Sequence, residues 1–279
     1  MTKDLRGAAA VRHIDQAKEL KVSPVYLAGE DRSGAARVLL PLRDDLGWSV
    51  GSTGIANVVL DSPCRRARIG YLPTHPLYSS LWVVRIAPGP LHPYQWSAVF
   101  SHGTPSEIVA DFAEALAYDL VGGGRDALRP EREFDRVLSA LIRAGWHKVQ
   151  EVRGAEGAEG VRDGGKLTFN SPDSLARIRW IDGSEVDADT RELGPHTGWA
   201  FSAGLPGAGW SALFSPEVPD HLVAAASRRL AVVQPVFRDE RELVPELRKH
   251  LTISLVSTDQ RTATGRDWSR RRREPRHGS

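Results

Sequence analysis

The sequence contains a single cysteine, Cys64, among its 279 residues. One cysteine excludes an internal disulfide framework and any zinc site built from several cysteines. No apolar run approaches the roughly 20 residues that a membrane-spanning helix needs. The first residues also lack the apolar stretch and cleavage site of a signal peptide. We therefore expect a globular cytoplasmic protein with no membrane partner.

Familiar catalytic motifs are missing as well. The sequence has no Gly-x-Ser-x-Gly elbow, no His-Glu-x-x-His pair and no Walker-type phosphate loop. Its nine histidines include no pair at a spacing of four. His75, His92 and His102 are interpreted as loop residues rather than a shared site, and Cys64 as a turn residue rather than a nucleophile. We expect no enzymatic activity, no metal and no cofactor.

Lysine is scarce, and the positive charge is unevenly distributed. Six lysines stand against 31 arginines, and the formal net charge is +2. Residues 261–279 hold seven arginines and two acidic residues, so the other 260 residues carry a net charge of −3. The abundance of Arg, Ala and Gly indicates a GC-rich coding bias, which weakens any inference from the choice of arginine over lysine.

An internal repeat organises the chain. Five blocks recur in the same order in both halves, and they match six of the eight tryptophans in three pairs. The matched blocks are Leu46-Gly47-Trp48 with Ala144-Gly145-Trp146, Asp61-Ser62-Pro63 with Asn170-Ser171-Pro172, Ala67–Tyr71 with Ala176–Trp180, Trp82 with Trp199, and Trp96–Ser101 with Trp210–Ser215. The chain is therefore a tandem duplication.

Each copy is predicted to form strands followed by a helix. Alternation with a period of two predicts strands near residues 55–61, 66–72, 81–87 and 95–101, and near 165–170, 175–181, 198–203 and 209–215. A shorter strand is expected after each Gly-Trp. The predicted fold class is α+β, with two pseudo-symmetric repeats that each contain an antiparallel sheet of about four strands followed by a helix.

Helix signals frame the strands of each copy. Thr104-Pro105-Ser106-Glu107 predicts a capping box and a helix start. A further helix is expected at about 131–143, and its counterpart in copy one is expected to be short because Pro41 interrupts it. We divide the chain into a flexible N-terminus (1–22), first repeat (23–120), linker (121–130), second repeat (131–238), C-terminal helix or extension (239–257) and disordered basic tail (258–279).

The repeated block resembles an actinobacterial family, the domain of unknown function 317 or SPDY type. Ser171-Pro172-Asp173, the paired Gly-Trp, the Trp-Ser-Ala-Val/Leu-Phe blocks and Tyr26-Leu27-Ala28-Gly29 carry the resemblance, which covers about residues 23–238. Copy one departs from it, with Cys64 where the family has Asp. The resemblance implies tandem copies but no established chemistry. At the level of fold, duplicated units of four strands and a helix also resemble the Whirly and PUR-repeat single-strand binders.

Alternation places the paired tryptophans on the core face of each sheet rather than on a stacking surface. The opposite face is predicted to be polar and basic in both copies, and the tail adds a run of arginines. The residues expected to contact phosphates are Arg66, Arg68, Arg85, Lys166, Arg177, Arg179, Arg270, Arg271, Arg272 and Arg273. A merely solvated face and a passive tail are the competing interpretations.

We expect a non-enzymatic nucleic-acid-binding protein that prefers DNA to RNA and reads single strands or duplex shape. The alternative is a protein–protein interaction module with the same surfaces, and the third hypothesis is a hydrolase. A deep pocket with a His–carboxylate pair would favour the hydrolase. The oligomeric state is left open.

Overall fold

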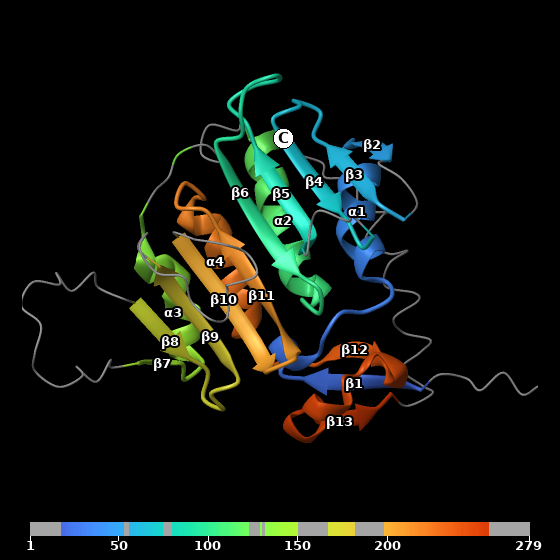
Figure 1. Ribbon diagram of the computed structural model, residues 1–279, viewed down its shortest axis with the longest axis vertical. Helices are drawn as coiled ribbons and strands as arrows, with labels where there is room; N and C mark the ends of the chain where they lie inside the picture. The colour runs from blue at the N-terminus through green and yellow to red at the C-terminus, as the bar shows by residue number, and fades with distance from the viewer. Residues whose placement is uncertain are drawn as a thin grey trace, which may run out of the picture.

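Within the part of the chain that the structure describes, the two copies of the repeat form one antiparallel sheet of ten strands, and the four α-helices cover one of its faces (Figure 1). The computed structural model describes residues 18–52, 56–74, 80–122, 129, 132–149, 167–181 and 198–256. In the sheet the strands are ordered β2-β3-β4-β5-β6-β11-β10-β9-β8-β7. The expected α+β class with two pseudo-symmetric repeats is confirmed, but the two predicted sheets are one continuous sheet.

Equivalent elements follow each other in the same order in each copy. Copy one contains α1 (Gly34–Asp44), β2 (Ser49–Ser52), β3 (Val58–Asp61), β4 (Ala67–Tyr71), β5 (Ser80–Ile86), β6 (Trp96–Ser101) and α2 (Ser106–Val121). Copy two contains α3 (Phe134–Arg143), β7 (His147–Lys148), β8 (Leu167–Asn170), β9 (Ala176–Ile181), β10 (Gly198–Leu205), β11 (Ala208–Phe214) and α4 (Asp220–Leu230). The strand after each Gly-Trp is present as β2 and β7.

A seam between β6 and β11 joins the copies. The backbone N–H of Ser211 donates to Ser101 Oγ at 2.8 Å, and the backbone N–H of Ser97 donates to Ser215 Oγ at 3.1 Å. Ser97 and Ser101 are the repeat counterparts of Ser211 and Ser215, so exchanging the copies converts one bond into the other. The seam therefore lies on a local two-fold axis between the copies.

The core lies between the sheet and the helices, which contact one another in the order α1-α2-α4-α3. The three matched tryptophan pairs are buried here, which confirms their assignment to the core. Phe112 of α2 lies 5.7 Å from Phe100 and 5.5 Å from Phe214, measured between ring centroids, below the seam. The aromatic packing of one copy is thus completed by the other.

Both ends of the described chain meet in a second, three-stranded sheet ordered β12-β1-β13. Its strands are β1 (Glu19–Ser23), β12 (Val236–Asp239) and β13 (Thr252–Leu255), and the short 3-10 helices η1 (Val25–Leu27), η4 (Glu240–Glu242) and η5 (Pro245–His250) flank them. Residues 19–22, expected to be flexible, therefore belong to a strand. The helix expected in the C-terminal extension is replaced by short 3-10 turns between two strands.

Two of the predicted helix features are wrong. The Thr104 hydroxyl donates to the Ser101 carbonyl instead of capping α2, and Glu107 is directed to Arg238. Helix α1 continues through Pro41 and has 11 residues, one more than α3. Pro41 is tolerated because the tertiary packing of Val38, Leu39 and Leu42 offsets the missing backbone hydrogen bond. Among the described helices, none is long and apolar enough to cross a membrane.

Candidate nucleic-acid interface

The face of the ten-stranded sheet that lies opposite the helices carries most of the predicted arginines. Arg68 of β4 and Arg85 of β5 are direct cross-strand neighbours, and Arg177 and Arg179 lie two residues apart on β9. Among the described strand residues of this face, Asp61 is the one carboxylate. The open face is therefore rich in cations although the chain without its tail is slightly acidic.

The remaining predicted residues fall elsewhere. Arg66 precedes β4, its backbone carbonyl accepts a hydrogen bond from Ala87, and its Nε atom is buried. Only part of the Arg66 side chain can therefore face a ligand. Lys166 and the Arg270–Arg273 run lie outside the residues that the structure describes.

The arginines form two groups rather than a continuous stripe. Five strand spacings separate β4 from β9, which corresponds to about 24 Å at about 4.8 Å per spacing. On β9 and the strands between the groups, Ile181, Ala200 and Leu213 form a small buried apolar cluster with Val99 packed against it. A ligand that contacts both groups must therefore span the seam.

The two groups differ in how their arginines are held. Arg68 donates from Nε and Nη2 to the carboxylate of Asp61 at 2.7 and 3.0 Å, and these bonds raise the pKa of Arg68. Its counterpart Arg177 donates from Nε to the neutral amide oxygen of Asn170 at 3.1 Å. The guanidinium of Arg85 lies 5.0 Å from the ring centroid of Tyr94. Copy two thus orients its arginine without neutralising it through this contact.

A groove of about 640 Å³ opens at the Arg177 end of the sheet. Its floor follows one cross-strand row, because Arg177 pairs with Ser202, Ser202 pairs with Ser211, and the N–H of Ser211 donates to Ser101 Oγ. The β10–β11 turn and the turn before β9 form its walls, with His102 at the β6 end. None of the described lining residues is acidic, so the groove suits an anionic or hydroxyl-bearing ligand.

The Ser-Pro turns of the repeat build the strand entrances beside these arginines. Ser62 Oγ accepts from the N–H of Ala67, and Ser171 Oγ accepts from the N–H of Ala176, at 3.0 and 2.9 Å. In copy two Asp173 also accepts a hydrogen bond from the hydroxyl of Tyr26 at 2.9 Å. Burial, followed by the charge of Asp173, raises the pKa of Tyr26. This acidic residue therefore has a structural role in copy two.

The equivalent turn of copy one lacks that tether. Cys64 takes the place of Asp173, and its thiol lies 3.3 Å from Ser62 Oγ in a hydrogen bond of either polarity. The thiol side chain is exposed on the turn. The turn keeps its geometry because the hydroxyl of Ser62, like that of its counterpart Ser171 in copy two, accepts a hydrogen bond from the backbone of the following strand.

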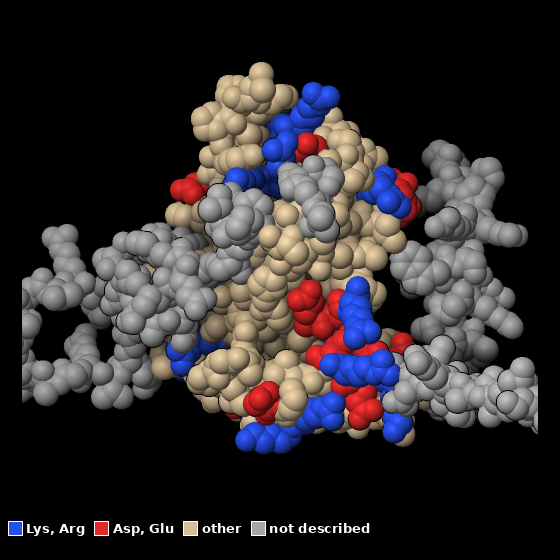
Figure 2. Space-filling view, turned by 45° about the vertical axis from the view of Figure 1, so that its right-hand side comes forward, with Lys and Arg blue, Asp and Glu red and all other residues tan. Residues whose placement is uncertain are grey.

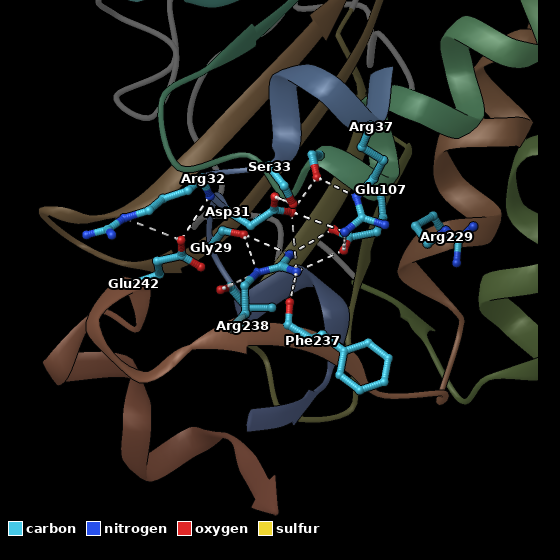
Figure 3. Close-up of polar contacts among 12 residues, drawn as sticks. Gly29, Asp31, Arg32, Ser33, Arg37, Glu107, Arg229, Phe237, Arg238 and Glu242 are labelled. Atoms are coloured by element: carbon cyan, nitrogen blue, oxygen red, sulfur yellow. Dashed lines mark hydrogen bonds and ion pairs between the residues drawn. The ribbon is translucent and has the colours of Figure 1, made fainter. Parts of the chain in front are cut away.

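A second charged region lies between α1, α2 and the three-stranded sheet (Figure 3). The fully buried Arg238 side chain donates two hydrogen bonds to Glu107, at 2.8 and 2.7 Å, and lies 3.5 Å from Asp31. It also donates to the backbone carbonyls of Ala28, Gly29 and Phe237. Each guanidinium nitrogen of Arg238 therefore donates hydrogen bonds to other groups of the protein.

The surroundings of Arg238 are equally well satisfied. Burial alone would raise the pKa of Asp31, but hydrogen bonds from Ser106 and Ser33 and the charges of Arg238 and Arg37 lower it below its usual value. The adjoining hollow of about 480 Å³ is lined by both signs of charge, with Glu19, Asp31, Asp239 and Glu242 beside Arg32, Arg37 and Arg238. This region joins the C-terminal strands to copy one and offers no surplus cation to a polyanion.

The surface view shows where charged side chains gather (Figure 2). A dense group of intermixed basic and acidic side chains gathers near the lower right, where the hollow beside Arg238 opens. At the upper end of the view the basic side chains are sparser, and they also have acidic side chains beside them. Intermixed charge is therefore densest in the region beside Arg238.

Among the described residues, the His–carboxylate pair within ion-pair distance lies on the helical side. The Nε2 atom of His221 on α4 lies 2.5 Å from Asp119 Oδ2 on α2, and both side chains are partly exposed. Neither residue lines the two hollows described above. The pair therefore joins two helices and is not the pocket-bound pair on which a hydrolase assignment would depend.

Sequence reasoning missed several of these residues. Ser202 and Ser211 lie out of phase with the buried Phe201 and Trp210, so alternation already places them on the open face, but isolated serines carry no chemical signal. The carboxylate partners of Arg238 are Glu107 and Asp31, which lie 131 and 207 positions earlier in the chain, and no local sequence pattern links them to Arg238.

Comparison with protein families agrees with the repeat. A family model described as SPDY, a domain of unknown function (DUF317), matches residues 61–119 and 170–236, one segment in each copy. No curated protein matches the chain. No solved structure matches it either.

Proposed function

Starting from a chain that carries two tandem SPDY domains, we propose a non-enzymatic nucleic-acid-binding protein that uses the open face of its ten-stranded sheet. DNA is the preferred class of ligand, and RNA the second. The observation that carries the proposal is the separation of charge, because the described strand residues of this face hold four arginines and one carboxylate. We also propose a cytoplasmic, actinobacterial setting, in keeping with the Arg-rich composition.

Arginine is suited to this task because its planar guanidinium stays charged and donates to phosphate oxygens in pairs. Arg68 and Arg85, with the accessible part of Arg66, form one phosphate-contacting group, and Arg177 and Arg179 form the second. A nucleic acid that crosses the seam would meet both groups about 24 Å apart. Lys166 and Arg270–Arg273 would add non-specific attraction from segments outside the described residues.

A protein partner is the alternative. Strand β13 is a terminal strand of the three-stranded sheet and exposes Ile253 and Leu255. Exposed strand edges pair readily with an added strand. This surface lies away from the arginines of the ten-stranded sheet, so the two hypotheses can be tested independently.

The test is fluorescence anisotropy with labelled single- and double-stranded DNA and RNA of about 20 nucleotides. Arg68→Ala/Arg85→Ala and Arg177→Ala/Arg179→Ala should each weaken binding at least fivefold and reduce the slope of log affinity against log salt by about 1.4 to 1.8. The charge-matched control is Arg43→Ala/Arg136→Ala, which removes two exposed, ion-paired arginines of α1 and α3.

The outcomes separate the hypotheses. Equal weakening in the control would show that only net charge matters, and absence of binding at low salt would refute the proposal. Binding that disappears on deletion of residues 261–279 and survives the sheet variants would assign the activity to the tail instead of the sheet.

A further inference from the structure

The groove of copy two combines one arginine with a line of hydroxyl groups. The row Arg177–Ser202–Ser211–Ser101 crosses the four neighbouring strands β9, β10, β11 and β6. At about 4.8 Å per strand the row extends over about 14 Å. The groove volume of about 640 Å³ falls within the range of about 300–1,000 Å³ that is typical of small-molecule sites.

Two of these hydroxyls have no hydrogen-bond partner within the described part of the chain. Ser101 Oγ donates to the His102 carbonyl and accepts from the N–H of Ser211. The hydroxyls of Ser202 and Ser211 make no such contact, and both side chains are only partly exposed. They are therefore available to donate to a ligand and to accept from it.

Arg177 is the groove cation that can meet an anionic group. His102 also lines the groove, and it lies near the half-buried Glu30, whose pKa is raised by burial. The neutral amide of Asn170 holds Arg177 in place. The groove thus offers one strong cation beside neutral hydrogen-bonding groups.

The repeat shows that this composition is specific to copy two. The counterparts of Ser174, Leu175 and Ser202 in copy one are Arg65, Arg66 and Arg85. Copy one therefore places further cations around Arg68 and its partner Asp61, whereas copy two places hydroxyls, a leucine and open backbone around Arg177 and its partner Asn170. The first arrangement suits a run of phosphates, and the second suits one phosphate with polar, uncharged groups beside it.

We propose that the groove binds a single nucleotide unit, with its phosphate on Arg177 and its sugar hydroxyls or base edge on Ser202 and Ser211. This inference rests on the proposed function, because the unit would be one nucleotide of the strand held by the open sheet face. Copy one then supplies charge and copy two supplies the recognition of one nucleotide.

Calorimetric titration of the full chain with the nucleoside 5′-monophosphates, the matching nucleosides and inorganic phosphate tests the inference. Arg177→Ala should weaken nucleotide binding about tenfold, and Ser202→Ala/Ser211→Ala should weaken it about fivefold with less than a twofold change for inorganic phosphate. Ser97→Ala is the matched control, because Ser97 is the counterpart of Ser211 on β6 and lies outside the groove. Thermal unfolding of each variant confirms that it is folded.

Failure of this inference differs from failure of the proposed function. Absence of nucleotide binding at about 10 mM, or equal affinity for nucleotide and inorganic phosphate, would overturn the groove assignment. Oligonucleotide binding that still depends on Arg68 and Arg85 would then leave the proposed function intact. Nucleotide binding without any oligonucleotide binding would refute the proposed function. It would also show that the groove binds a free nucleotide and not one nucleotide of a strand.

Discussion

Arg177 donates a hydrogen bond to the neutral side chain of Asn170, at the place where its repeat counterpart Arg68 is bound by the carboxylate of Asp61. The strand register is the same in both copies, since Asp61 faces Arg68 and Asn170 faces Arg177. The residue that faces the arginine thus has the same place in both copies, but it is charged in copy one and neutral in copy two. On a face proposed to bind phosphates, Arg68 therefore has a competing carboxylate at this position and Arg177 does not.

Asp61→Asn should therefore tighten nucleic-acid binding. The substitution makes copy one resemble copy two by removing the carboxylate that neutralises Arg68. We expect affinity to rise about two- to fivefold at low salt, with a salt slope steeper by up to about 0.9. Asp44→Asn is the control, because it releases Arg43 on α1 with the same change in net charge. The same gain in both variants would contradict a contact at Arg68.

Glu107→Gln should destabilise the fold strongly. The substitution removes the charge that pairs with the fully buried Arg238, and removing one partner of a buried pair costs about 3–5 kcal/mol. Chemical denaturation measures the change in unfolding free energy. Glu114→Gln, at an exposed position of the same helix, should change it by less than about 0.5 kcal/mol. A small effect at Glu107 would show that Arg238 finds compensation from Asp31.

Acid should remove the stability that Asp31 provides. The pKa of Asp31 is lowered in the folded state, so its ionised form stabilises the protein above the usual aspartate value of about 3.9. This contribution is lost as the pH falls below that value and through the folded-state pKa. Asp31→Asn should therefore destabilise at pH 7, and its effect should shrink progressively as the pH falls below about 4, as measured by urea unfolding. A pH-independent difference would refute the role of the charge.

Asp220→Ala should destabilise copy two. The fully buried Asp220 accepts hydrogen bonds from Trp199 Nε1 at 3.0 Å and from the backbone N–H of Glu133 at 2.6 Å. The buried indole N–H of Trp199 would lose its acceptor, which costs about 1–3 kcal/mol, and the Glu133 N–H and the side chain of Arg132 would also lose their partner, so the expected loss is about 3 kcal/mol. Thermal unfolding followed by tryptophan fluorescence measures it. Asp135→Ala, at an exposed position in the first turn of α3, should leave stability nearly unchanged.

Local patterns in the sequence predicted much of this fold. Alternation located the eight longer strands to within about three residues, and the matched tryptophans indicated which face is buried. The pattern at Thr104–Glu107 misled because a capping box requires Glu107 to turn back on its own helix. In the folded protein a buried arginine, 131 residues later, binds that carboxylate instead.

The sequence alone determined the duplication, the strands of each copy and the division between core tryptophans and open-face arginines, because these follow from order and from short-range periodicity. Only the tertiary structure decided that both sheets merge along β6 and β11, that the arginines separate into two groups, and that Ser202 and Ser211 line a groove with Arg177. Those features depend on pairing between strands distant in the chain. Such pairing depends on how the whole core packs, and no single segment of the sequence contains enough information to predict it.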